Sequence, residues 1–89
     1  MGVKLIMPTF LQPVTEDKEF IEVEGKTVGE CLREVYRQYP AIEKMLMDKD
    51  KLRNYIGVYI NGQDAYPNEI TKPVKAGDIV HVLYTIAGG

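Results

Sequence analysis

The chain has 89 residues, enough for one domain with a single small core and too few for two. Its 11 Lys and Arg residues against 13 Asp and Glu residues give a net charge of −2, which argues against nucleic acid or an anionic membrane as a partner. One cysteine, Cys31, and one histidine, His81, exclude an internal disulfide and a metal site built from these residue types, and we expect the protein in the reducing cytoplasm.

The first 24 residues predict an opening β-hairpin. Apolar residues alternate along 3–7 until Pro8, which indicates a strand with at least one buried face. A turn-rich stretch, 9–18, follows. Apolar and acidic residues then alternate over 20–24 and predict the second strand of the hairpin.

A helix is predicted to begin at Thr27. Thr27 and Glu30 match a capping box, in which the Thr27 side chain accepts from the Glu30 amide and the Glu30 carboxylate reaches back to the Thr27 amide. An apolar stripe at helical spacing follows, formed by Val28, Leu32, Val35 and Tyr39. Pro40 marks the end of this helix. A short second helix is expected within 41–48, and then a solvated loop that carries the charged run 48–51.

The second half of the chain predicts the remaining strands. Residues 55–60 read as a strand that stops at the Asn61-Gly62 turn, with a short strand near 65–66, a loop over 67–75 and a last strand over 79–84. These strand-sized runs are the longest apolar segments, so no membrane span is expected. The order ββαβ(β)β predicts an α+β domain over 1–84, with a mixed sheet on one main helix, followed by a flexible tail, 85–89.

The tail ends in Gly88 and Gly89, and a glycine pair can enter a narrow active-site channel in conformations that other residues resist. The Gly89 carboxylate would then be the reactant, and it needs activation, for example as an acyl-adenylate, because it is a poor electrophile. The sequence shows no phosphate-binding loop with a lysine, no Ser/His/Asp set and no suggestive carboxylate pair. We therefore predict a protein substrate with no catalytic residue, metal or bound cofactor of its own. His81 and Cys31 fit ordinary structural roles.

The run 76–89, with Gly77-Asp78, an apolar strand and the ending Ile-Ala-Gly-Gly, resembles the ending of the ThiS/MoaD family of ubiquitin-like sulfur carriers. The likeness extends to the element order of nearly the whole chain. It implies a β-grasp fold with four to five strands on one main helix plus a short helix. It also implies that an E1-like, ATP-using adenylyltransferase adenylates Gly89, and that the resulting thiocarboxylate delivers sulfur inside a partner enzyme.

Residues 6–13 are similar to the Pro-Thr-x-Leu-x-Pro opening of the family's carriers for cysteine synthesis, and 52–61 resemble their central strand. The resemblance thus favours a pyridoxal-phosphate sulfhydrylase, making cysteine or homocysteine, as the sulfur acceptor. Tyr84-Thr85 departs from the proline-containing pair that often precedes the family's tail. Alternatives are a molybdopterin synthase small subunit, a thiamine-thiazole sulfur carrier, a ubiquitin-like modifier that forms isopeptides, and an interaction module with an incidental tail.

The last predicted strand is apolar on both faces, whereas a sheet with one solvated face would carry more polar residues there. If Val80 and Val82 point at the helix, the opposite face carries a docking patch for the E1-like enzyme or the acceptor. This patch, with the tail residues beside it, would comprise Ile79, His81, Leu83, Ile86 and Ala87. The alternative is a central strand that is covered on both sides.

Overall fold

The strands and helices of the computed structural model, which describes residues 2–84, follow the predicted order. They are β1 (Val3–Ile6), a 3-10 helix η1 (Thr9–Thr15), β2 (Phe20–Val23), α1 (Val28–Gln38), α2 (Pro40–Leu46), β3 (Met47–Asp48), β4 (Lys51–Leu52), β5 (Ile56–Ile60), β6 (Gln63–Asp64), a 3-10 helix η2 (Glu69–Thr71) and β7 (Ile79–Tyr84). Among the helices of residues 2–84, none has both the length and the apolar character needed to cross a bilayer.

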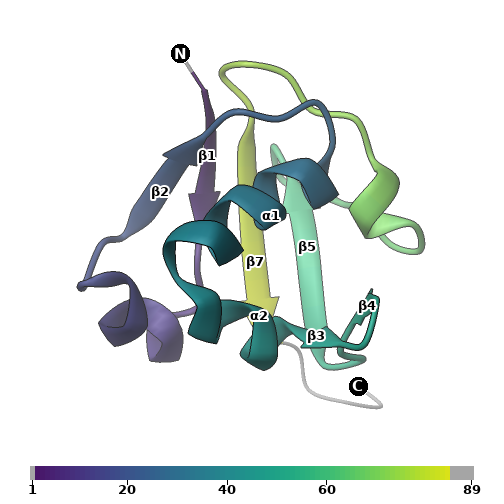
Figure 1. The fold of residues 1–89 in the computed structure, drawn as a ribbon. Helices are drawn as coiled ribbons and strands as arrows, with labels where there is room; N and C mark the ends of the chain where they lie inside the picture. The colour runs from purple at the N-terminus through teal and green to yellow at the C-terminus, as the bar shows by residue number, and fades with distance from the viewer. Residues whose placement is uncertain (1, 85–89) are drawn as a thin grey trace.

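Five strands form one mixed sheet in the order β2-β1-β7-β5-β6, and α1 crosses one of its faces (Figure 1). The β1–β2, β5–β6 and β5–β7 pairs are antiparallel, whereas β1 and β7 run parallel at the centre. The register places Leu5 beside both Ile21 and Val80, and Val82 beside Val58. The predicted α+β class, with a mixed sheet on one main helix and a short second helix, is confirmed.

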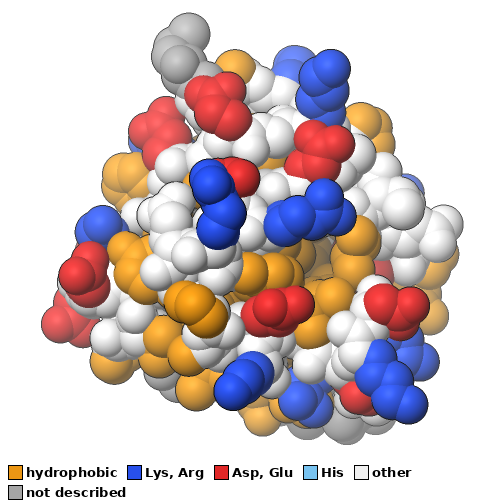
Figure 2. Space-filling model, viewed as in Figure 1, with side chains coloured by type: hydrophobic (Ala, Val, Ile, Leu, Met, Phe, Trp, Pro, Cys, Tyr) orange, Lys and Arg blue, Asp and Glu red, His pale blue; other side chains and the backbone are white. Residues whose placement is uncertain are grey.

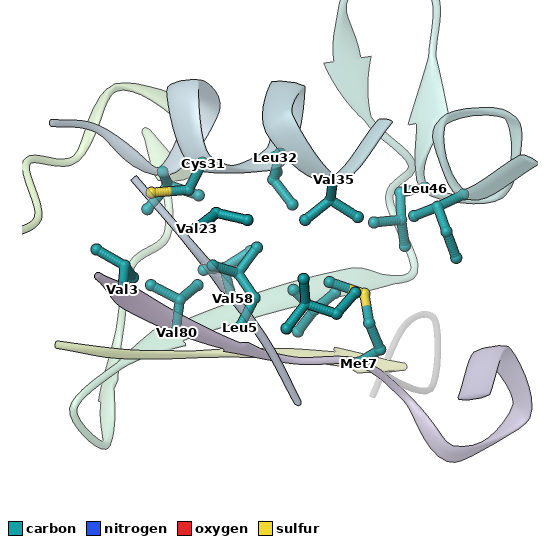
Figure 3. Packing of buried hydrophobic residues seen from close by; sticks show 14 of the residues in the cluster. Val3, Leu5, Met7, Val23, Cys31, Leu32, Val35, Leu46, Val58 and Val80 are labelled. Carbon is teal, nitrogen blue, oxygen red and sulfur yellow. The ribbon is translucent and has the colours of Figure 1, made fainter. Parts of the chain in front are cut away.

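The core lies between α1 and the sheet. Cys31, Leu32 and Val35 project from α1 toward the strands, where Leu5 and Val80 meet them (Figure 3). All five side chains are at most 1% exposed. Because burying a Val or Leu side chain stabilises a fold by about 1.5–3 kcal/mol, this two-layer contact is the main source of stability.

The N-terminus of α1 is capped as the sequence predicts, with one difference. The Thr27 hydroxyl accepts from the Glu30 amide at 3.1 Å, but the Glu30 carboxylate accepts from the amide of Lys26 at 2.8 Å. The side chain thus reaches one residue further back than the capping box requires. Both bonds satisfy amides near the start of the helix that have no intrahelical acceptor.

Three short segments differ from the sequence-based expectation. The charged run 48–51 is a hairpin of β3 and β4, because Met47 and Leu52 on either side pack against the core and Lys49 adopts a left-handed φ of 63° at the turn. Residues 9–15 form the 3-10 helix η1, and the short strand after Asn61-Gly62 is at 63–64, two residues earlier than expected.

The helix-covered face of the molecule carries interspersed Lys, Arg, Asp and Glu side chains around a hollow with an apolar lining (Figure 2). No single sign of charge dominates this face. A surface of mixed charge produces no strong field to attract a polyanion.

Candidate functional site

The candidate site is the end of β7 from which the tail continues, together with the sheet face that α1 leaves uncovered. The predicted site residues Ile86, Ala87, Gly88 and Gly89 lie outside the described residues. Ile79, His81 and Leu83 lie within them, on β7.

The strand that leads into the tail is held on both sides. β7 pairs with β1 through residues 79–81 and with β5 through residues 80–84, so that its last residue, Tyr84, is opposite Ile56. Val80 and Val82 are fully buried under α1. Tyr84, the residue that precedes 85–89, is therefore held by a central strand.

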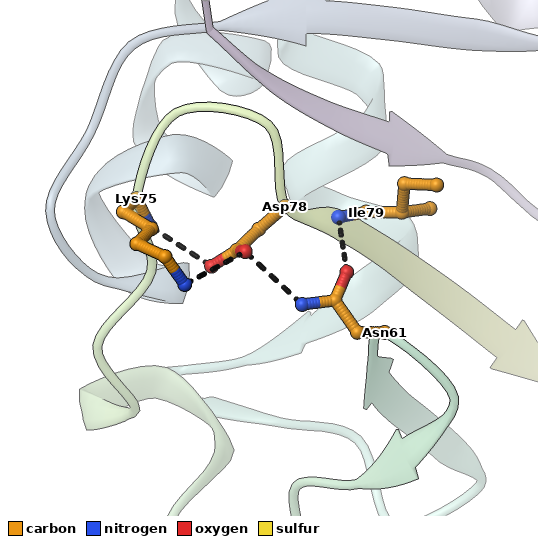
Figure 4. A network of polar contacts seen from close by, with 4 residues as sticks. All are labelled: Asn61, Lys75, Asp78 and Ile79. Atoms are coloured by element: carbon orange, nitrogen blue, oxygen red, sulfur yellow. Dashed lines mark hydrogen bonds and ion pairs between the residues drawn. The ribbon is translucent and has the colours of Figure 1, made fainter.

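A polar network fixes the other end of β7 (Figure 4). The Asp78 carboxylate accepts from the side-chain amide of Asn61 at 3.0 Å and from the backbone amide of Lys75 at 2.9 Å. The Asn61 side-chain oxygen accepts from the Ile79 amide at 2.9 Å. Asn61 and Gly77 both have positive φ, 51° and 94°, which these residue types tolerate.

These contacts stabilise the charged form of Asp78. The hydrogen bond from Asn61, then that from the Lys75 backbone, and the nearby Lys75 ammonium hold the pKa of the Asp78 carboxyl below its usual value. The sequence presented Gly77-Asp78 only as part of a family pattern. The structure shows that Asp78 joins the turn before β7 to the turn after β5.

An aromatic pair marks the root of the tail. The rings of Tyr55 and Tyr84 lie 5.0 Å apart between centroids and are tilted by 53°. Such pairs contribute about 0.5–1.5 kcal/mol beyond their burial. Tyr84 departs from the family's usual pattern, and its ring packs on Tyr55, a contact that sequence reasoning missed because Tyr55 was interpreted only as part of a strand.

The uncovered sheet face carries the predicted exposed residues and three more. Ile79 is 43% exposed, His81 is exposed and Leu83 is half-buried. The strand register adds Ile6, Phe20 and Tyr59, which form a row with His81 across four strands. We call these residues the open-face patch: Ile6, Phe20, Tyr59, Ile79, His81 and Leu83. The burial of Val80 and Val82 confirms the predicted orientation of β7, and it leaves the docking role untested.

Cys31 is fully buried in α1. Burial, with the nearby Glu30 and Glu24 carboxylates, raises the pKa of its thiol to about 11. The thiol is thus protonated and out of reach of solvent, a poor nucleophile. Within residues 2–84, no group of three His, Cys, Asp or Glu side chains is placed to hold a metal ion.

The family comparison covers the candidate site as well as the core. A model described as the ThiS family matches residues 5–89, which include β7 and the glycine pair. The chain belongs to the ThiS family.

Individual relatives of this ThiS-family chain agree with the assignment. It is 29% identical, over an alignment 93 positions long, to the sulfur carrier protein CysO of Mycobacterium tuberculosis, with all of both chains covered. Among solved structures it is similar to one chain in the crystal structure of the Amycolatopsis orientalis BexX/CysO complex, with a TM-score of 0.88, 31% identity and coverage of 99% of this chain and 100% of that one.

A crystal structure of M. tuberculosis CysO gives a TM-score of 0.86 at 26% identity and covers 96% of this chain and 100% of its own. The small archaeal modifier protein 1 of Methanosarcina acetivorans shares the fold, with a TM-score of 0.84 at 21% identity and coverage of 99% and 96% of the two chains. These similarities confirm the expected ubiquitin-like β-grasp fold of the ThiS-family chain.

Proposed function

We propose that this protein is a sulfur carrier whose Gly89 carboxylate is converted to a thiocarboxylate. The observation that carries the proposal is the match of the ThiS family model through residue 89. The relatives named as sulfur carrier proteins, which cover the full chain, support it. In this role the protein is a substrate and sulfur donor. It supplies no catalytic residue and binds no cofactor.

The chemistry would occur in partner enzymes. A Gly89 carboxylate oxygen attacks the α-phosphorus of ATP in an E1-like adenylyltransferase, and pyrophosphate leaves. A hydrosulfide ion then adds to the acyl carbon of the adenylate, AMP leaves, and a proton is released from sulfur. The product is a thiocarboxylate, which is a better nucleophile than the original carboxylate because its sulfur is more polarisable.

For the acceptor we propose a pyridoxal-phosphate sulfhydrylase that makes cysteine or homocysteine, acting with the carrier in the cytoplasm. The relatives named CysO support this choice over molybdopterin or thiazole synthesis. In the Amycolatopsis orientalis crystal structure, CysO is in a complex with a second protein, BexX, which supports the expectation that this chain also works with a protein partner.

We further propose that the open-face patch and the tail residues Ile86 and Ala87 dock the E1-like enzyme or the acceptor. The patch combines exposed apolar side chains with a rigid central strand. Apolar side chains on a rigid surface can be buried against a partner without the entropic cost of ordering a loop.

The deciding experiment is intact-mass analysis of the chain after incubation with a cognate E1-like enzyme, ATP and sulfide. We expect the mass change of one oxygen replaced by one sulfur, located to Gly89 by fragmentation. A chain lacking Gly89 is the matched control and should keep its original mass. An unchanged mass with an enzyme proven active on another carrier would contradict the proposal. Adducts to lysine side chains without a thiocarboxylate would instead identify a protein modifier.

A further inference from the structure

The strand β2 forms an edge of the sheet. In the order β2-β1-β7-β5-β6 its one strand neighbour is β1, and within residues 2–84 no strand lies on its outer side. Figure 1 shows β2 at the left margin of the sheet, with α1 in front of the sheet. The opposite margin is β6, which has only two residues.

The hydrogen bonds of β1 determine which main-chain groups of β2 face outward. The Lys4 amide donates to the Asp78 carbonyl at 3.0 Å, so the main-chain groups of Lys4 point toward β7. Backbone groups alternate in direction along a strand, so those of Val3 and Leu5 point toward β2. Their register partners there are Val23 and Ile21.

The intervening residues of β2, Phe20 and Glu22, therefore direct their amide and carbonyl groups away from β1, along the outer edge. Such unpaired groups are a template for one more strand. Strand addition would bind through the main chain of Phe20 and Glu22, with side chains at alternate positions selecting the partner.

The charges along this edge select a basic partner. Residues 16–24 contain five acidic residues and one basic residue, Lys18. The Lys18 ammonium is occupied, with the Tyr39 hydroxyl at 3.2 Å and the Glu16 carboxylate at 3.7 Å. Lys4 is the register partner of Glu22, and its ammonium lies 4.7 Å from the centre of the Phe20 ring. The outer edge thus keeps a net negative charge.

The same charges oppose a second copy of this chain. Antiparallel pairing of β2 with another β2 brings Glu22 opposite or diagonal to Glu22 of the other copy when the pair is centred on Glu22 or Ile21. Like charges at such positions destabilise a strand pair. An extended segment with Lys or Arg at alternate positions would instead place positive charges beside the carboxylates of this edge, which stabilises a strand pair.

We propose that the outer edge of β2 binds an extended basic segment of a partner protein by antiparallel or parallel strand addition. The site is two strands away from β7, about 10 Å across the sheet. A partner held there leaves the end of β7 accessible. Binding of a segment at β2 does not require that Gly89 carries sulfur.

The test is a titration of the full-length, nitrogen-15-labelled chain with a capped peptide of about eight residues that alternates lysine and valine. We expect backbone amide shifts centred on Phe20 and Glu22. A peptide of the same sequence with N-methyl groups on the residues that face β2 should bind about tenfold more weakly, because it loses two or more main-chain hydrogen bonds. A peptide with glutamate in place of lysine should not bind.

Two variants separate charge from main-chain bonding. The Glu22 carboxylate also accepts from the Gly2 amide at 3.1 Å. Glu22→Gln therefore removes the charge while it keeps an acceptor for Gly2 and the main-chain amide, and about threefold weaker binding with a smaller salt dependence is expected. Glu22→Pro also removes the outward amide, which an edge strand tolerates, and should weaken binding about fivefold further. Glu43→Ala, which removes an exposed carboxylate from α2, is the control and should bind as the wild type does.

Thermal melting shows whether each variant is folded. If Glu22→Pro does not fold, the N-methylated peptide with the wild-type chain decides the question. Equal binding of the N-methylated and parent peptides, shifts that map away from β2, or no binding at millimolar peptide would overturn the proposal. If the free chain formed a concentration-dependent dimer whose amide shifts map to β2, the edge would bind a second copy of the chain. That result would also overturn the proposal.

Discussion

Asp78 shows how a single carboxylate can place a whole strand. It accepts hydrogen bonds from Asn61 and Lys75 and has only 7% of its surface exposed. Asn61 in turn accepts from the first amide of β7. The turn before β7 and the turn after β5 are thereby joined at one residue, and this sets where β7 enters the sheet.

This contact predicts a pH-dependent stability. The pKa of Asp78 is lowered in the folded chain, chiefly by Asn61 and then by the Lys75 amide, so its contribution is complete above the ordinary value of 3.8 and is lost as the pH falls through the folded pKa. Asp78→Asn should therefore lower stability at neutral pH and flatten its decline in acid. Urea unfolding at a series of pH values measures both effects.

Other carboxylates also titrate in acid, so a control is needed. Glu69→Gln in η2 removes a carboxylate that no described ion pair uses, and its stability should fall with pH in parallel with the wild type. If Asp78→Asn followed that same curve, the network in Figure 4 would not contribute to acid stability.

At the scale of the element, β7 has two faces with different tasks. Val82 is fully buried, whereas Ile79 is 43% exposed on the open-face patch. Val82→Asp would bury an unpaired carboxylate and should destabilise the domain by about 4 kcal/mol, a large part of a small domain's stability. Ile79→Asp should cost about 1 kcal/mol and weaken binding to the E1-like enzyme by about 2 kcal/mol or more. The melting temperature of each variant measures the loss of stability, and calorimetry measures the loss of affinity for the E1-like enzyme.

Leu83 is a less clear test than Ile79, because it is half-buried and its substitution would change both quantities. Gln63→Asp on β6 introduces the same carboxylate outside the patch and serves as the control. If Ile79→Asp bound the enzyme as tightly as Gln63→Asp does, the open-face patch would not be the docking surface.

The elements with a clear period were predictable from sequence. Alternation predicted the strands that became β1 and β2, apolar runs predicted β5 and β7, and the capped apolar stripe predicted α1. The 47–52 hairpin was not predictable, since its charged turn resembles a solvated loop and the packing of Met47 and Leu52 that holds it is tertiary.

The candidate site was only partly predictable for the same reason. Alternation identified Ile79 and His81 as one face of a strand. It could not show that Ile6, Phe20 and Tyr59 lie in a row with His81, because strand order and register are set by contacts between distant segments. The hydrogen bond between Asn61 and Asp78 was not predictable either, because these residues are 17 positions apart in the sequence and meet only in the folded sheet.

At the scale of the whole molecule, the described residues form one hydrophobic core between α1 and the sheet. Its buried hydrophobic residues all lie between Val3 and Val82. Deleting Gly88 and Gly89 should therefore change the free energy of unfolding by less than about 0.5 kcal/mol while it abolishes thiocarboxylate formation. Urea unfolding and intact-mass analysis of the same sample check this. A large loss of stability would show that the pair belongs to the fold.

The parallel pairing of β1 with β7 has a consequence for synthesis on the ribosome. β7 is the last of the described strands to be made, yet it lies in the middle of the sheet, between β1 and β5. A nascent chain that has not yet released residues 79–84 lacks Val80 and Val82, so the two halves of its sheet have no strand to join them. Long-range pairing of this kind closes late. An enzyme that recognises the assembled sheet would therefore reject chains in which β7 has not yet paired with β1 and β5.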